Sequence, residues 1–450
     1  MWSVIFKIKT TGNAKPIGEK IIKLTIFAPM TILIKQAKII SPDSPHHGKV
    51  RDVLVQKGKI TQIAKQISTS KAEVWQHNNA HLSSGFADIG TQIGDPGFEH
   101  KEDLHSAAKA AFAGGYTTLV CKPNTQPVIS TKSEVLYIRN QADSPVDFYP
   151  IGAVSKDCKG KEITEMYDMR QAGAVAFSDG CNSLNDSGLM MRSLLYVKPF
   201  DGIIINQALD PHLSHGGHLH EGAVSTSLGM KGIPALAEEL MLQRDLYLLE
   251  YTDSRLHVAN VSCANSVSLI RQAKKRGLRV TASVNPMNFA FDDTSLTTFD
   301  SNLKVMPPLR ENNDIKALKK GLKDGTIDFI CTNHTPEDEE GKKLEFVYAR
   351  PGVIALETTF AVSRTHLNKI IDIEELIQKI AIEPRRIFGL NIPVIAEGET
   401  ANICLFDPDK TWTFTEKNIY SKSKNTPFVG HELIGKILAT MNKSQVWKAF

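Results

Sequence analysis

Residues 83–124 decide the fold of this chain, and they read SSGFADIGTQIGDPGFEHKEDLHSAAKAAFAGGYTTLVCKPN. Two short apolar runs, ending near Gly90 and Asn124, flank residues 101–115, which have the apolar spacing of an amphipathic helix. Gly114 and Gly115 supply the stop signal of that helix. The stretch therefore predicts a strand, a helix and a second strand parallel to the first.

The same alternation continues to about residue 390. Eight short, apolar, β-branched runs end near Gly90, Asn124, Val154, Asp179, Gln207, Asn260, Asn285 and Asn333. Helix candidates separate them, for example ALAEELMLQRDLYLLEYT at residues 235–252. Eight alternations predict an α/β fold, a (β/α)8 TIM-like barrel over residues 83–390. In that fold functional side chains gather at the C-terminal ends of the strands.

The two ends of the chain have a different pattern. Residues 30–82 contain short alternating strands with a Gly-centred hairpin at Lys57-Gly58-Lys59, and residues 391–450 return to this pattern. We therefore predict a small β-sandwich domain formed by both termini, residues 30–82 plus 391–450. Residues 1–29 precede Met30, where the strand pattern begins, and we interpret them as an extension or a misassigned start.

Composition excludes several classes of protein. Lys plus Arg is 53 and Asp plus Glu is 49, which gives a net charge of +4 without a long basic run, so we expect no nucleic-acid partner. No apolar run reaches the roughly 18 residues of a membrane span, and six separated cysteines without a CxxC pair indicate free thiols. We expect a cytoplasmic protein that binds no membrane and forms a homo-oligomer.

Three motifs identify a family. GFADIGTQIGDPGFEH, LKVMPPLRENND and TNHTPEDEEGKK follow one another along the chain, each at a predicted strand end. From Met30 onward the chain resembles dihydroorotase of the cyclic amidohydrolase family. The resemblance implies a barrel with a small β-sandwich and a site of one or two zinc ions. In pyrimidine biosynthesis that site opens dihydroorotate or closes its ring from N-carbamoyl-aspartate.

The sequence departs from the family at the metal site. The family motif Asp-x-His-x-His-x-Arg falls on Asp88 to Gly94, so both histidines are missing and Gly94 replaces the arginine that binds the substrate carboxylate. The family's metal-ligand positions correspond to Gly90, Gln92, Asp179, Gln207, Asn260 and Asn333. Asn333 also stands where the family has its catalytic acid–base aspartate.

These replacements remove the chemistry that the resemblance implies. Zinc sites need imidazole, thiolate or carboxylate ligands, whereas amides are poor ligands and glycine has no side chain. Without a metal, the pKa of water stays far above neutral pH, and an asparagine cannot accept its proton. We therefore expect no intact metal site, no catalytic residue and no cofactor. Asp179 is the one acidic side chain left, and its alternative role is to cap a loop.

Some matching residues survive. Asn124 and His334 match the family's other contacts to the substrate carboxylate, so we interpret them as vestigial substrate-binding residues or as loop scaffolding. His257 lies in an apolar strand, where a buried, hydrogen-bonded histidine is expected rather than a ligand. Four histidines between His212 and His220 form either a solvated loop or a replacement metal site.

Three functions are compatible with this sequence. The first is a catalytically inactive dihydroorotase-like protein of pyrimidine biosynthesis that acts as a structural partner of aspartate transcarbamoylase, a partner that only the resemblance implies. The second is an active dihydroorotase with an unusual metal site, for which zinc would be the cofactor. The third is a metal-free sensor of a small molecule, which a ligand would stabilise against unfolding.

Overall fold

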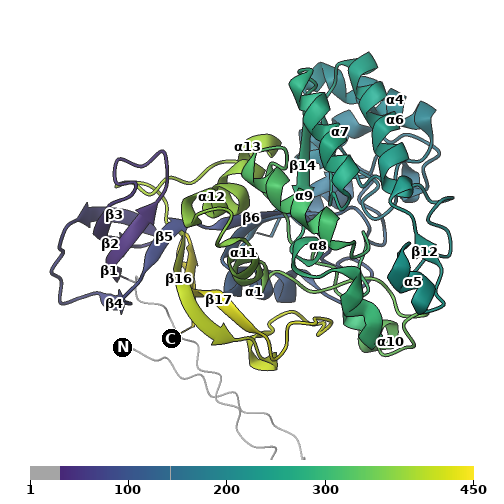
Figure 1. Cartoon of the computed structure of the whole chain (residues 1–450). Helices are drawn as coiled ribbons and strands as arrows, with labels where there is room; N and C mark the ends of the chain where they lie inside the picture. The colour runs from purple at the N-terminus through teal and green to yellow at the C-terminus, as the bar shows by residue number, and fades with distance from the viewer. Residues whose placement is uncertain (1–30, 142, 450) are drawn as a thin grey trace, which may run out of the picture.

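The computed structural model describes residues 31–141 and 143–449 (Figure 1). The predicted extension at residues 1–29 lies outside these residues. In Figure 1 the purple strands β1–β4 lie at one side of the molecule, and the barrel helices α4, α6 and α7 lie at the other. No helix in the described part of the chain is long and apolar enough to cross a membrane.

One sheet joins the two ends of the chain. Its strands are β1 Thr31–Ile40, β2 Val50–Gln56, β3 Lys59–Ala64, β4 Glu73–Gln76, β5 His81–Ser84, β16 Asn402–Thr413, β17 Glu432–Asn442 and β18 Gln445–Lys448. They follow the order β18-β17-β16-β5-β1-β2-β3, and β4 also pairs with β1. The predicted hairpin is confirmed, because Lys57 and Gly58 both have positive φ, 50° and 74°, as a two-residue type I′ turn requires.

The second sheet contains eight parallel strands. They are β6 Phe86–Thr91, β7 Tyr116–Cys121, β8 Asp147–Gly152, β9 Ala176–Phe177, β10 Ile204–Asn206, β13 Leu256–Val258, β14 Val280–Val284 and β15 Phe329–Ile330. The sheet runs in chain order from β6 to β15. All eight predicted run ends lie within three residues of these strand ends. The fold is therefore the predicted TIM-like barrel with a second, mostly-strand domain, while the exact domain boundaries stay predictions.

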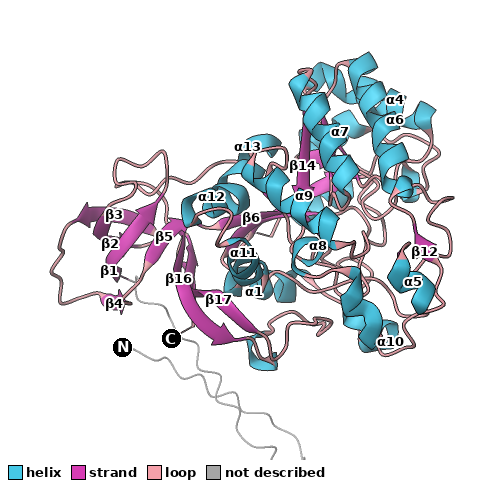
Figure 2. Ribbon diagram, viewed as in Figure 1, coloured by secondary structure: helices cyan, strands magenta, loops and turns pink. Residues whose placement is uncertain are grey.

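Helices connect the barrel strands and surround them (Figure 2). They are α1 Leu104–Ala113, α2 Lys132–Arg139, α3 Met166–Ala172, α4 Ser187–Val197, α6 Leu236–Thr252, α7 Ala264–Lys275, α9 Asn312–Lys323, α11 Thr359–Leu367, α12 Ile373–Ile377 and α13 Glu383–Phe388. Shorter elements between them are α5 Ala223–Ser227, α8 Met287–Ala290, α10 Glu339–Lys342, β11 Leu219–His220 and β12 Gly232–Ile233.

The first helix shows how local sequence sets an element. The carboxylate of Asp103 accepts the backbone N–H of Ser106 at 2.8 Å and caps the start of α1. The helix ends at Ala113, as the glycine pair predicts. A Cβ at Gly114 would lie 2.0 Å from the backbone oxygen of Leu356, so only glycine fits there.

The barrel interior is a packed core. Its buried apolar side chains come from the strands and from α13: Ile89, Val120, Ile151, Ala176, Ile203, Ile205, Phe329, Cys331 and Phe388. These residues fill the inside of the barrel, and sites in this fold lie at the C-terminal ends of the strands.

Candidate functional site

Asp88 joins the first barrel strand to the segment after the last. Its carboxylate accepts the backbone N–H and the hydroxyl of Thr332, at 2.6 and 2.7 Å, and also the hydroxyl of Thr91. Beside it the backbone N–H of Gln92 donates to the carbonyl of His334 at 3.0 Å. These bonds hold the segments that follow β6 and β15 against each other at the barrel mouth.

A lysine follows β7 at the same end of the barrel. The ammonium of Lys122 donates to the side-chain oxygen of Asn333 at 3.1 Å, and the residue is 8% exposed. A Cβ at Gly90 would lie 3.4 Å from Cε of this lysine, so the glycine leaves room for the lysine side chain. Within residues 31–141 and 143–449, no carboxylate lies within 4.0 Å of the Lys122 ammonium.

Asparagines continue from this lysine. Because an ammonium only donates, Asn333 must present its oxygen to Lys122, and its amide nitrogen donates to the carbonyl of Met306 at 3.1 Å. Asn260 donates to the same Asn333 oxygen at 3.2 Å and accepts from Asn285 at 3.2 Å. Asn260 and Asn333 have φ of 55° and 49°, a conformation that asparagine tolerates better than most residues.

Asp179 and Asn124 bind neighbouring backbone. Asp179 accepts the N–H of Ser155 at 2.8 Å and the hydroxyl of the same serine, and burial raises the pKa of this carboxyl. The amide of Asn124 donates to the carbonyl of Asp179 at 3.0 Å and accepts the N–H of Cys181 at 2.9 Å. Both side chains therefore fix the loops that follow β7, β8 and β9.

His334 is fully buried between a carboxylate and a turn. Its Nδ1 accepts the backbone N–H of Ala355 at 3.1 Å, so the proton lies on Nε2, which faces the Glu102 carboxylate at 3.4 Å. Burial raises the pKa of the Glu102 carboxyl, but its contacts with His334, Ser106 and Ser421 together outweigh burial, so the pKa is lowered. This arrangement ties the segment after β15 to the start of α1.

The two glutamines lie at separate strand ends. Gln92, after β6, has its amide nitrogen 2.7 Å from the sulfur of Cys181. Gln207, after β10, is buried, and its backbone carbonyl accepts the hydroxyl of Ser183 at 2.6 Å. The six family ligand positions thus lie around the barrel mouth, but only one of them carries a carboxylate.

A cavity of about 210 Å³ opens at this mouth. Its lining consists of Gln92, Gly94, Phe98, Lys101, Glu102, Asn124 and Pro336. Lys101 forms an ion pair with Glu337 at 2.8 Å. Gly94 has φ +69°, and a Cβ there would lie 2.3 Å from the backbone oxygen of Glu102. The backbone at Gly94 therefore has no room for the arginine that the family motif has at this position.

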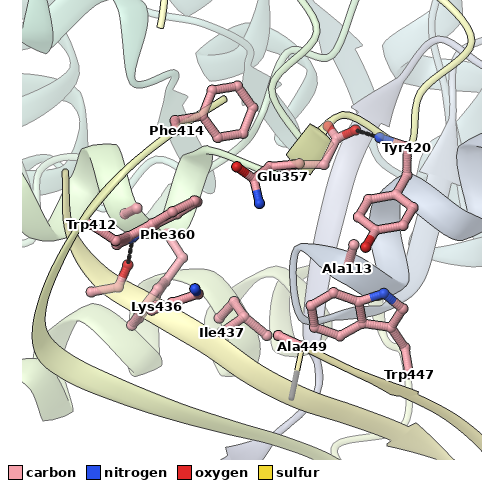
Figure 3. A pocket seen from close by; sticks show the side chains of 13 residues that line it. Ala113, Glu357, Phe360, Trp412, Phe414, Tyr420, Lys436, Ile437, Trp447 and Ala449 are labelled. Atoms are coloured by element: carbon pink, nitrogen blue, oxygen red, sulfur yellow. Dashed lines mark hydrogen bonds between the residues drawn. The ribbon is translucent and has the colours of Figure 1, made fainter. Parts of the chain in front are cut away.

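A second cavity, of about 110 Å³, lies away from the mouth (Figure 3). Its lining includes Phe360 of α11, Trp412 of β16, Trp447 of β18 and Phe414, which directly follows β16. Glu357 points its carboxylate away from this cavity to the backbone N–H groups of Tyr420 and residue 421, at 3.0 and 2.9 Å. No position that the family motifs single out as a ligand lies in this lining.

Two other histidines that the sequence singles out, His257 and His220, have protein partners. His257 is buried between the hydroxyls of Thr281 and Ser283, at 2.9 and 3.0 Å, and burial lowers its pKa to about 3. His220 contacts Arg310 through Nδ1 at 3.0 Å. In the part of the chain that the structure describes, no group of three or more His, Cys, Asp and Glu side chains is placed to hold a metal ion.

Comparison with known proteins shows the family to which this chain belongs. The family model described as "Dihydro-orotase-like" matches residues 81–266, and that of the amidohydrolase family matches residues 211–446. A dihydroorotase of Syntrophus aciditrophicus is 40% identical over 93% of this chain and 99% of its own length. One of Acetivibrio thermocellus is 39% identical over 92% and 98%. This chain belongs to the dihydroorotase-like amidohydrolases.

Solved structures agree on the fold of this dihydroorotase-like protein. L-hydantoinase (dihydropyrimidinase) from Arthrobacter aurescens superposes with a TM-score of 0.79 at 23% identity, over 92% of this chain and 95% of that one. Dihydropyrimidinase from Brevibacillus agri has a TM-score of 0.79 at 21% identity, over 93% and 95%. These likenesses concern the fold alone.

The residues at the family's metal positions do not fit zinc. The only carboxylate among them, that of Asp179, is bound to Ser155. Two positions are amides that bind each other, Asn260 and Asn333, and the Lys122 ammonium contacts one of them. Zinc prefers anionic or imidazole ligands, and a neighbouring cation repels it. At the positions that align with the family's ligands, these side chains are therefore a poor donor set for a catalytic zinc ion.

Two functional candidates were missed at the level of sequence, Lys122 and Glu102. The signal for Lys122 was its place directly after an apolar strand, where a barrel puts its site. Glu102 gave no such signal, because it precedes a helix and meets His334 only in the folded chain. Whether Asn124 and His334 contact a ligand stays a prediction.

Proposed function

We propose that this protein serves pyrimidine biosynthesis without dihydroorotase activity, as a structural partner of aspartate transcarbamoylase. The Lys122 ammonium carries this proposal, because it lies beside Asn333 among the family's metal positions. A cation there disfavours zinc, and the amide of Asn333 cannot take a proton from water. The proposal therefore includes no cofactor.

The test is an assay of purified protein. Ring opening of dihydroorotate and ring closure of N-carbamoyl-aspartate are measured before and after loading with zinc, and bound zinc is quantified on the same sample. The dihydroorotase of Syntrophus aciditrophicus, assayed in parallel, is the positive control. We expect no turnover and no stoichiometric zinc in this protein. Turnover that rises with zinc refutes the proposal.

The relatives' name favours a second candidate, an active dihydroorotase with an unusual metal site. Relatives that are 40% and 39% identical over more than nine-tenths of this chain are called dihydroorotase. If zinc-dependent turnover occurs, the ligands must come from outside the family positions. Replacing His218 and His220 by alanine then tests the histidine loop, since loss of bound zinc would identify it as the source.

An apolar strip on α6 supports the partner role. Its residues are exposed and lie on one helix face, because their spacings of four and seven follow the helical period: Leu236, Leu240, Tyr247 and Tyr251. Exposed apolar surface of this kind marks interaction sites.

The free cysteines fit a reducing cytoplasm, where we place the protein.

Mixing with aspartate transcarbamoylase tests the partner. Size-exclusion chromatography should show one co-eluting complex, and replacing Leu240 and Tyr251 by lysine should dissolve it. Two unassociated species would refute the partnership. A larger species of this chain alone that the same substitutions dissolve would instead assign the strip to a homo-oligomer.

A further inference from the structure

Lys122 differs from the other buried lysines. Among the described residues Lys122, Lys304 and Lys342 are the buried lysines, 8%, 7% and 4% exposed. The ammonium of Lys304 donates to the carbonyls of residues 346 and 347, and that of Lys342 to the carbonyls of residues 301, 350 and 352. Lys122 has one hydrogen bond, to Asn333. Two of its three donors therefore have no partner in the described chain.

An ammonium in this position needs an anion. A charge removed from water is stable only when an opposite charge or several hydrogen bonds replace the lost hydration. The carboxylate on the adjacent strand, Asp88, is bound by Thr91 and Thr332 instead. Among residues 31–141 and 143–449, no carboxylate therefore forms an ion pair with this buried cation.

Space for a ligand lies at the same strand ends. The cavity of about 210 Å³ is lined by Gln92 after β6, Asn124 after β7 and Pro336 after β15. Lys122 also follows β7, and its partner Asn333 also follows β15. Phe98 gives this cavity an apolar side, and Gln92 gives it a polar one. Such a lining suits a small molecule with one charged end.

We infer that Lys122 anchors a binding site for a small organic carboxylate, which forms the missing ion pair with its ammonium. The inference deepens the proposed function and rests on it, because a zinc ion at the family's metal positions would compete with the lysine. A carboxylate fits better than a phosphate, since one ammonium matches a single charge. Phosphate sites usually gather several cations or backbone N–H groups.

Calorimetric titration of the full chain tests this site. The probes are dihydroorotate and N-carbamoyl-aspartate in a buffer free of metal and chloride, with inorganic phosphate as the comparison anion. Lys122→Met removes the cation and keeps much of the side-chain volume. Asn333→Asp instead places a carboxylate beside Lys122, so it should compete with the ligand. Lys304→Met is the matched control, because that lysine is equally buried but donates two hydrogen bonds to backbone carbonyls.

We expect the unchanged protein and Lys304→Met to bind at least one of the two carboxylates. Lys122→Met and Asn333→Asp should each lose about tenfold or more in affinity, the usual worth of one charge-assisted bond. Equal binding by Lys122→Met, no binding by the unchanged protein, or phosphate binding as tight as carboxylate binding would overturn the inference. If Lys122→Met does not fold, Asn333→Asp decides alone.

This outcome is separate from that of the proposed function. Zinc-dependent turnover would refute the proposed function whatever the carboxylates do. If the protein has no turnover and Lys122→Met binds the carboxylates as tightly as the unchanged protein, only the carboxylate site is refuted.

Discussion

Replacing Asp179 by alanine should destabilise this protein, because its carboxylate caps the loop after β8. It accepts two hydrogen bonds from Ser155, a backbone N–H at 2.8 Å and a hydroxyl, and both residues are buried. A hydrogen bond to a charged group contributes about 1.5 to 3 kcal/mol. Burial raises the pKa of Asp179, so desolvation offsets part of that gain. We expect the free energy of unfolding to fall by about 2 to 4 kcal/mol.

An asparagine at the same position separates capping from metal binding. Its oxygen can accept the N–H of Ser155, and its amide nitrogen can donate to the serine hydroxyl. Asp179→Asn should therefore lose less than about 1 kcal/mol. Asp186 is the control, since it caps the start of α4 from an exposed position, and its alanine variant should lose about 1 kcal/mol.

Urea unfolding followed by tryptophan fluorescence gives these free energies, and zinc is quantified on each protein. An Asp179→Ala variant that unfolds at the same urea concentration as the unchanged protein would refute the capping role. An asparagine variant that keeps its stability but loses stoichiometric zinc would show that Asp179 is a metal ligand.

Three further predictions have defined outcomes. Gly94→Ala should lower the free energy of unfolding by about 2 kcal/mol or more, and Gly90→Ala by about 1 kcal/mol. Both glycines have positive φ, but only at Gly94 would a Cβ lie 2.3 Å from a backbone oxygen. Equal losses of stability in urea unfolding would contradict this. Burial lowers the pKa of His257 to about 3. Between about pH 6.5 and 3 this histidine is therefore protonated in the unfolded chain but not in the folded one, so stability falls as the pH drops. Between pH 7.5 and 5 the free energy of unfolding should fall by about 2 kcal/mol because of His257. His257→Gln should remove this part of the pH dependence. An unchanged dependence of stability on pH would show that His257 does not cause it. Lys304→Met should lower the free energy of unfolding by about 1 to 3 kcal/mol, and Lys122→Met in ligand-free protein should not, which the same unfolding curves compare.

The barrel could be predicted because its signals are local. Each strand run and each helix, such as the one at residues 235–252, carries its own apolar period, and α6 indeed covers Leu236–Thr252. The glycine pair after α1 and the hairpin at Lys57-Gly58 are local signals of the same kind. Local patterns therefore gave the order of elements, and the count of eight strand–helix alternations predicted the barrel.

The contacts inside the site could be predicted only in part. The sequence showed which side chains stand at the strand ends, but the contact of Asp179 with Ser155, 24 residues away, forms only in the folded chain. The pairing of Lys122 with Asn333 joins residues 211 positions apart, and no periodicity encodes such a contact. The side-chain direction of Lys122 depends on the space beside Gly90, which only the folded barrel defines.

The sheet that joins both ends of the chain sets an order of assembly. β5 pairs with β16, so Leu82 lies opposite Leu405 and the entire barrel is synthesised between the two partners. During translation β5 therefore has a free edge until residue 413 has left the ribosome, and free edges attract other chains. A chain truncated before β16 would keep every barrel strand and would still expose this edge permanently. Its yield of unaggregated protein would report on the last strands to be made, not on the site at the barrel mouth.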